Sequence, residues 1–205
     1  MKLHGAGMRC GIGAIGDRGI DFILDAIERV YDAAPRPDSR PSSEHCSLPT
    51  QEALERMKRL DVTSSTSVGF GWELEDQYRG FMGMEWMKRY IPMRSFKEMG
   101  IIASGNADYP VCSANIMEGI CLRQQDQRDR AGPGAELGYP GDGRARLNGA
   151  YITFEEDIKG SIEPGKLADF AVLDTDILTC NPGDIHKTKV VTTIVDGKVV
   201  YKREG

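Results

Sequence analysis

The chain has 205 residues, with 31 acidic and 26 basic side chains, and its net charge of −5 argues against nucleic acid or an anionic membrane as the main partner. The length suffices for one or two domains with a real core, but it falls short of the roughly 250 residues of a complete (β/α)8 barrel. The sequence holds no apolar run of about 18 residues that could span a membrane. Five cysteines without a CxxC pair indicate free thiols in a reducing cytoplasm.

The first part of the chain alternates short strands with helices. A glycine-interrupted strand is expected at residues 8–14, and Asp17 is placed to cap a helix over residues 18–33. After a loop rich in Pro and Ser, residues 44–46 read as the end of a second short strand. The helix carries apolar residues at helical spacing: Ile20, Ile23, Leu24, Ile27 and Val30.

The same alternation continues to about residue 118. Thr50 is the expected N-cap of a second helix, and a run of Val, Thr and Ser favours a strand over residues 62–68. A helix over residues 93–99 is expected to end at Gly100, and a buried strand follows at residues 101–104. This order predicts a parallel α/β unit over residues 1–118.

The character of the sequence changes after that unit. Residues 121–146 hold a polar run and a glycine-rich string with almost no apolar side chains, so they are predicted to be solvated or disordered. Pro164-Gly165 predicts a turn before a strand at residues 170–173. Asp196-Gly197 predicts a two-residue type I′ turn between two β-branched strands. The end of the chain is therefore expected to form an antiparallel sheet.

Three loops at the predicted carboxyl ends of strands could carry chemistry, at residues 13–18, 44–46 and 107–110. A His and an Asp from different strand ends, here His45 and Asp108, can share one divalent cation. On spacing alone this signal is weak, because a lone His is more often a structural hydrogen-bonding residue. A lone Asp before Tyr-Pro is more often a turn residue.

Several segments, in the same order, resemble the amidohydrolase superfamily, and within it the amidohydrolase-3 (YtcJ-like) branch. They are Ala-Ile-Gly-Asp-Arg-Gly-Ile-Asp at residues 14–21, Glu-His-Cys-Ser-Leu-Pro at 44–49, Ala-Asp-Tyr-Pro-Val at 107–111, and Asn-Gly-Ala-Tyr at 148–151 followed by Pro-Gly-Lys-Leu-Ala-Asp at 164–169. Because several motifs keep their order over most of the chain, chance is a poor explanation for the resemblance.

The resemblance implies an α/β fold: residues 1–150 would be the C-terminal part of a TIM (β/α)8 barrel, and residues 151–205 would supply strands of a small β-sandwich domain. It implies that His45 is the metal ligand from the sixth barrel strand. Asp108 would be the eighth-strand aspartate, which binds the metal and handles the proton of the attacking water. The implied cofactor is a divalent metal, zinc or else iron or manganese. The implied reaction is hydrolysis of a C–N bond in a small-molecule amide or cyclic amide.

The departures from the family pattern bear on activity. Family members carry a fifth-strand His just before the Ala-Ile-Gly-Asp-Arg motif, where this chain has Gly13. The first-strand His-x-His and the fourth-strand ligand would lie before residue 1, and His4 and His186 match no ligand position and are predicted to be surface residues. A catalytic zinc usually takes three protein ligands plus water. The expectation is therefore a family member whose own activity is weak or absent.

Two rival interpretations come from other classes of protein. The first is a non-catalytic remnant or partner-binding fragment, whose exposed barrel edges would lead to self-association. The second is a nucleotide-binding module, based only on the spacing Gly11-x-Gly13-x-x-Gly16.

Two further features have competing explanations. Cys46 beside His45 invites a thiol-nucleophile interpretation, but successive strand residues point to opposite faces, so the pair is not expected to meet. Residues 69–89, rich in aromatic residues and Met without a clean period, could line a substrate pocket or form partly exposed core.

Overall fold

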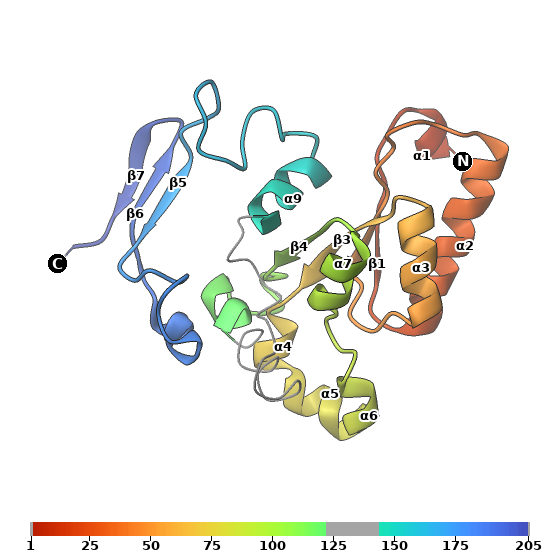
Figure 1. Cartoon of the computed structure of the whole chain (residues 1–205), viewed down its shortest axis with the longest axis horizontal. Helices are drawn as coiled ribbons and strands as arrows, with labels where there is room; N and C mark the ends of the chain where they lie inside the picture. Colours follow the sequence, from red (N-terminus) through yellow and green to blue (C-terminus); the bar gives the residue numbers. More distant parts are fainter. Residues whose placement is uncertain (1, 122–143, 205) are drawn as a thin grey trace.

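The computed structural model describes residues 2–121 and 144–204, which form a four-stranded parallel sheet and a separate three-stranded antiparallel sheet (Figure 1). Within the described residues, no helix combines the length and apolar character needed to cross a bilayer. In chain order the elements are α1 (Lys2–Gly5), β1 (Gly11–Ala14), α2 (Asp17–Ala33), β2 (Ser42–His45), α3 (Gln51–Arg59), β3 (Thr63–Ser67), α4 (Phe70–Glu73), α5 (Glu75–Met82), α6 (Met84–Met87), α7 (Met93–Met99), β4 (Ala103–Asn106), α9 (Arg144–Ile152), β5 (Phe170–Leu173), the 3-10 helix η1 (Pro182–Lys187), β6 (Val190–Val195) and β7 (Lys198–Lys202).

The parallel sheet has the order β1-β2-β3-β4, so each strand pairs with the next one along the chain. Helices α2, α3 and α7 connect these strands and lie together beside the sheet (Figure 1). The parallel α/β unit predicted from the sequence is confirmed.

Helix α2 forms because its apolar residues recur at helical spacing, and four of them, Ile20, Ile23, Leu24 and Ile27, are buried. Its start differs slightly from the prediction. Gly16 is the N-cap residue and Asp17 is the first helical residue, so the Asp17 side chain does not cap the helix as expected. Its carboxylate instead accepts a hydrogen bond from the neighbouring Arg18 N–H (2.7 Å), and a negative charge in the first turn still favours the helix.

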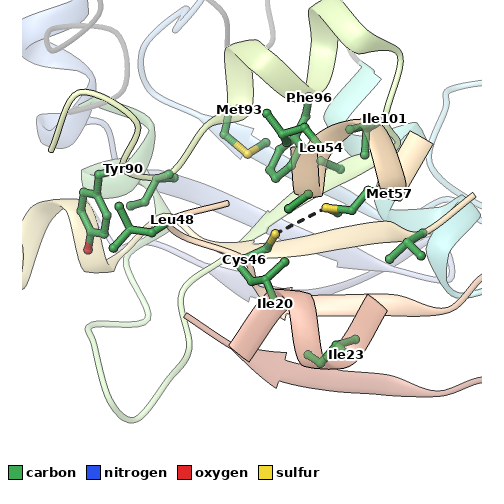
Figure 2. Close-up of a cluster of buried hydrophobic side chains, with 14 of the residues drawn as sticks. Ile20, Ile23, Cys46, Leu48, Leu54, Met57, Tyr90, Met93, Phe96 and Ile101 are labelled. Carbon is green, nitrogen blue, oxygen red and sulfur yellow. Dashed lines mark hydrogen bonds between the residues drawn. The ribbon is translucent and has the colours of Figure 1, made fainter. Parts of the chain in front are cut away.

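The ends of α3 and α7 are as predicted. The Thr50 side chain accepts a hydrogen bond from the Ala53 N–H (3.0 Å), which caps α3. Helix α7 ends at Gly100, which takes the left-handed conformation (φ +67°) common at helix C-termini. The two helices and α2 bury their apolar side chains in one core, shown with its labelled members in Figure 2.

Two regions had no regular element predicted. Residues 69–89, whose apolar residues follow no clean period, contain the short helices α4, α5 and α6. Residues 122–143 lie outside the described part of the chain, so the predicted disorder of 121–146 is not tested there. On either side of the undescribed residues, residues 116–121 are helical and α9 begins at Arg144. The prediction for this segment stays untested.

The antiparallel sheet follows the turn chemistry of the sequence. The Lys166 N–H donates to the Glu163 carbonyl across Pro164-Gly165 (3.2 Å), and Gly165 has a φ of +94°. Strands β6 and β7 are joined at Asp196-Gly197, whose φ angles of +49° and +73° are those that a type I′ turn requires. Both predicted turns are confirmed.

Arg40 joins the parallel unit to the segment after α9. Its guanidinium donates to the Asp38 carboxylate (2.6 Å) and the Tyr151 carbonyl (2.6 Å), and it pairs with Glu156 (2.8 Å). It also lies over the rings of Tyr151 and Phe154, at 3.7 and 4.1 Å from their centroids. The hydrogen bond from Arg40 holds the pKa of Glu156 below its usual value. Because the Arg40 side chain is only 11% exposed, its positive charge is stabilised by these partners more than by water.

We expect Arg40→Met to lower the free energy of unfolding by about 2 kcal/mol, because it leaves two carboxylates and a carbonyl without their charged donor. Urea unfolding followed by circular dichroism measures this change. Lys88→Met is the matched control, since Lys88 pairs with Glu85 at a site where both side chains are largely exposed. Equal effects of the two substitutions would contradict the role of Arg40.

Candidate functional site

The carboxyl ends of the parallel strands are tied together by backbone hydrogen bonds. The Cys46 N–H donates to the Ala14 carbonyl (2.9 Å) and the Leu48 N–H to the Ile15 carbonyl (3.0 Å). On the other side, the Val68 N–H donates to the Asn106 carbonyl (3.0 Å). These bonds hold the loops after β1, β2, β3 and β4 at one edge of the sheet, where α/β folds carry their sites.

His45 is the last residue of β2 and is half-buried at this edge. Its φ of +66°, in the left-handed region, is costly for a non-glycine residue and turns the side chain out of the regular strand direction. The imidazole Nδ1 lies 2.7 Å from the Ser67 Oγ, and the ring stacks on Phe70 with 5.5 Å between centroids. A Cβ added at Gly13 would lie 3.6 Å from both Nε2 and Cδ2 of this ring. The free edge of the imidazole therefore faces the position of Gly13.

Cys46 does not join His45 in a nucleophilic pair. It is fully buried on the helix side of the sheet, and its thiol donates to the Met57 sulfur (3.7 Å; Figure 2). Burial raises the pKa of the Cys46 thiol to about 12, although Ser43 and Ser64 partly oppose the shift by hydrogen bonding. A buried thiol that stays protonated is inert, which agrees with the expectation from the sequence.

Asp108 follows β4 and also has a left-handed backbone, with φ +54°. Its carbonyl accepts a hydrogen bond from the Val111 N–H (2.8 Å), which closes a turn. Its carboxylate lies close enough to Cys112 to contribute, after burial and Glu73, to the raised pKa of that thiol. His45 and Asp108 extend from strands on opposite sides of β3, about 10 Å apart at the backbone. Within the part of the chain that the structure describes, their side chains share no hydrogen bond.

Sequence reasoning missed three polar residues beside His45. The Ser67 hydroxyl donates to the Asn106 Oδ1 (2.9 Å), and the Asn106 amide donates to the Ser65 carbonyl (3.0 Å) and hydroxyl (2.8 Å). The pairing of Ser65 with Ser104 and of Ser67 with Asn106 places these residues on one face. The alternation of residues along the predicted strand could have placed Ser65 and Ser67 together, but Asn106 lies beyond the strand expected at residues 101–104.

Gly11 lies close against a side chain of β2. A Cβ at Gly11 would lie 2.7 Å from the Glu44 Oε1, which itself accepts a hydrogen bond from Ser42 (2.6 Å) and lies 3.9 Å from the Arg9 guanidinium. The structure therefore gives a reason for a small residue at Gly11, whereas a Cβ would have only ordinary contacts at Gly13 and no contact within 4 Å at Gly16. Nucleotide binding itself stays an untested alternative.

Three residues behave differently from their predicted surface or local roles. His4 and His186 are half-buried rather than surface residues: His4 Nε2 lies 2.8 Å from the Ala34 carbonyl, and His186 packs on Trp72 with 5.4 Å between ring centroids. Asp17 forms its ion pair with Arg89 (3.8 Å) from the distant α6–α7 region. These contacts join loops across the fold, which sequence spacing does not reveal.

The aromatic segment divides between core and surface. Phe70 and Tyr90 are each only 3% exposed, and Phe70 contacts His45, whereas Phe81 is 88% exposed. Phe70 and Tyr90 therefore pack in the core, and Phe70 also stacks on the imidazole of His45. The interpretation of this segment as a substrate pocket stays a prediction.

The described residues do not form a complete metal centre. In residues 2–121 and 144–204, no three side chains of His, Cys, Asp or Glu lie close enough together to hold a metal ion. His45 offers an imidazole and Asp108 a carboxylate, while Gly13 offers no side chain. Since a catalytic zinc takes three protein ligands, the donor set present does not fit a metal on its own.

The chain is similar in sequence to known proteins over nearly its whole length. A profile of the amidohydrolase family (Amidohydro_3) matches residues 1–137 and 142–201. The chain is 30% identical over 207 residues to the N-substituted formamide deformylase of Arthrobacter pascens, covering 97% of this chain and 38% of that protein. It is 23% identical to the putative amidohydrolase YtcJ of Bacillus subtilis (strain 168), covering 98% and 39%. The chain thus spans about two fifths of the length of these relatives.

Solved structures share the fold. An uncharacterized metal-dependent hydrolase from Pyrococcus horikoshii OT3 matches with a TM-score of 0.66 and 22% identity, covering 89% of this chain and 37% of that one. An adenosine deaminase from Xanthomonas campestris with bound zinc matches with a TM-score of 0.64 and 14% identity, covering 97% and 46%. At these identities the likeness concerns the fold alone.

We expect Cys46 to resist iodoacetamide in the folded protein at about pH 8, because its thiol is buried and protonated. The partly exposed Cys10 serves as the internal control and should react under the same conditions. Peptide mass spectrometry after timed quenching measures both sites. Labelling of Cys46 at the rate of Cys10, without unfolding, would contradict the buried and protonated state.

Proposed function

The chain belongs to the amidohydrolase family, and we propose on that premise that it carries part of the site of a metal-dependent hydrolase. The reaction class is hydrolysis of C–N bonds in amides or cyclic amides by metal-activated water. The name of the Arthrobacter pascens relative adds N-substituted formamides to the substrates worth assaying first. The family match over nearly the whole chain supports this class.

The observation that carries the proposal is the position of Gly13 against His45. The family pattern places a fifth-strand His where this chain has Gly13 and a sixth-strand His where it has His45. The Cβ position of Gly13 lies 3.6 Å from His45 Nε2, so a side chain at Gly13 would meet the imidazole at its free nitrogen. Two ligands of one metal are expected to converge in this way.

The same family pattern gives the proposed architecture. The parallel unit would be the C-terminal part of a TIM barrel, with residues 1–150 as one domain, and β5–β7 would be strands of a β-sandwich within residues 151–205. His45 and Asp108 would then extend from the sixth and eighth barrel strands. Zinc, iron and manganese all suit imidazole and carboxylate donors.

The activity of this chain by itself is proposed to be weak or absent. One imidazole and one carboxylate fall short of the three protein ligands of a catalytic zinc. Support from neighbouring hydrogen bonds tunes a metal site by about 10–100-fold and does not replace a missing ligand. Further ligands would have to come from outside the described residues.

A non-catalytic, partner-binding fragment is the second candidate, and the free edge of β1 favours it. Gly11, Ile12 and Gly13 are exposed, and β1 pairs with β2 on one side only. Phe22 of the adjacent helix α2 is 75% exposed. An uncovered strand edge beside exposed apolar side chains pairs readily with another chain, and a second copy of this chain is the proposed partner.

We expect Gly13→His to raise zinc affinity by at least about tenfold, because it places a second imidazole beside His45, with its Cβ at an ordinary contact distance from the His45 ring. Elemental analysis after dialysis and zinc titration should show only background metal in the unaltered chain. The gain should disappear in the double variant Gly13→His/His45→Ala. Near-stoichiometric zinc in the unaltered chain that disappears in His45→Ala would instead show that other ligands complete the site, and Gly13→His without any gain would sink the proposed geometry.

Self-association through β1 is expected to weaken by about tenfold in Ile12→Lys, since a lysine on an edge strand opposes pairing. Sedimentation velocity over a range of concentrations measures it. Ile158→Lys is the control, because Ile158 is similarly exposed but lies in the segment after α9. A monomer at all concentrations would contradict the second candidate.

A further inference from the structure

Three hydrogen bonds connect the side chain of His45 to the backbone of the neighbouring strand. We infer that Ser67 and Asn106 are positioning residues that hold neutral His45 with its proton on Nδ1, so that the unprotonated Nε2 is presented beside Gly13. The direction of each hydrogen bond follows from the chemistry of its partners.

The direction of the hydrogen bonds is set first at the Ser65 carbonyl, because a carbonyl can only accept a hydrogen bond. It lies 3.0 Å from the side-chain amide of Asn106, so the atom facing it must be the Nδ2 nitrogen. The same nitrogen also donates to the Ser65 hydroxyl (2.8 Å). The remaining oxygen of Asn106, Oδ1, therefore faces Ser67.

The next link is the Ser67 hydroxyl, which has a single hydrogen. That hydrogen is used toward the Asn106 Oδ1 at 2.9 Å. At its 2.7 Å contact with His45 Nδ1, the Ser67 oxygen must then be the acceptor. The proton of the neutral imidazole consequently sits on Nδ1.

An imidazole protonated on Nδ1 has a free electron pair on Nε2. Stacking on Phe70 (5.5 Å, interplanar angle 18°) fixes the plane of the ring, and Nε2 lies 3.6 Å from the Cβ position of Gly13. The residue is thus prepared to meet a divalent cation or a hydrogen-bond donor on that side. The use of Nε2 for a metal rests on the proposed function, whereas the tautomer rests on the hydrogen bonds alone.

His4 provides a built-in reference of opposite tautomer. Its Nε2 lies 2.8 Å from the Ala34 carbonyl, which can only accept, so neutral His4 carries its proton on Nε2. The same spectrum of one sample can therefore show both tautomers.

The test is a long-range ¹H–¹⁵N spectrum of the ¹⁵N-labelled full chain at about pH 8.5, where histidine side chains are neutral. His45→Gln assigns the resonances. We expect a protonated Nδ1 and an unprotonated Nε2 in His45, and the reverse in His4. A protonated Nε2 in His45 would overturn the inference, whatever happens in any variant.

The role of the two positioning residues is tested by Ser67→Ala and Asn106→Ala. Without Ser67 the acceptor for Nδ1–H is lost. Without Asn106 the Ser67 hydroxyl is free to donate to Nδ1, so both variants should move His45 toward the Nε2-protonated form. Ser64→Ala is the matched control, because Ser64 is an equally buried serine of β3 whose hydroxyl contacts Ser43 and Thr66 instead. An unchanged tautomer in folded Ser67→Ala and Asn106→Ala would refute the positioning role.

Titration of the Gly13→His variant with zinc chloride separates this inference from the proposed function. If the function is right, zinc shifts the Nε2 resonance of His45 in this variant, and the affinity falls by about 10–100-fold when Ser67→Ala is added to it. If zinc leaves Nε2 unmoved while the tautomers are as expected, the proposed metal site fails and the positioning inference stands.

Discussion

The left-handed turn at the end of β2 is the constraint on which the candidate site depends. His45 and Cys46 both have positive φ (+66° and +42°), a conformation that costs about 1–2 kcal/mol per non-glycine residue. The turn directs the imidazole to the carboxyl edge of the sheet and the thiol into the helix-covered core, onto Met57. Backbone bonds from Leu48 to Ile15 and from Ile91 to Ser47 then hold the neighbouring loops around it. The turn therefore places one of its two side chains in the site and the other in the core.

The features that could be predicted from the sequence are those with a local cause. Helix α2 has an apolar period, α3 and α7 have a capping residue at one end, and Asp196-Gly197 has the backbone freedom of its turn. Helices α4–α6 were missed because each is four to eight residues long, too short to display a period. The bonds from Ser67 to His45 and Asn106 were missed because they join three strands, and only the register of the sheet brings those residues together.

Gly13 has no effect on the family to which the chain belongs, but it bears directly on the ability of the site to hold a metal ion. The sequence around it matches the amidohydrolase family, as does nearly the whole chain, and a glycine at this one position does not alter the fold class. A metal site responds differently, because each ligand supplies a bond that no neighbouring group replaces. The Cβ position of Gly13 meets only the His45 ring, at an ordinary contact distance. A Cβ beside Nε2 is therefore accommodated without rearrangement of the sheet.

The polar network beside His45 also bears on what the site can still do. Polar groups shielded from solvent and hydrogen-bonded to one another are costly to rearrange, so the part-buried bonds among Ser65, Ser67 and Asn106 hold the imidazole in one orientation whether or not a metal is bound. Such an orientation removes part of the entropic cost of binding. What the proposed metal site lacks is then a second ligand beside Nε2, since the histidine itself is already oriented. Because Gly13 is the backbone position that faces Nε2, it is where a single substitution should have the largest effect on metal binding.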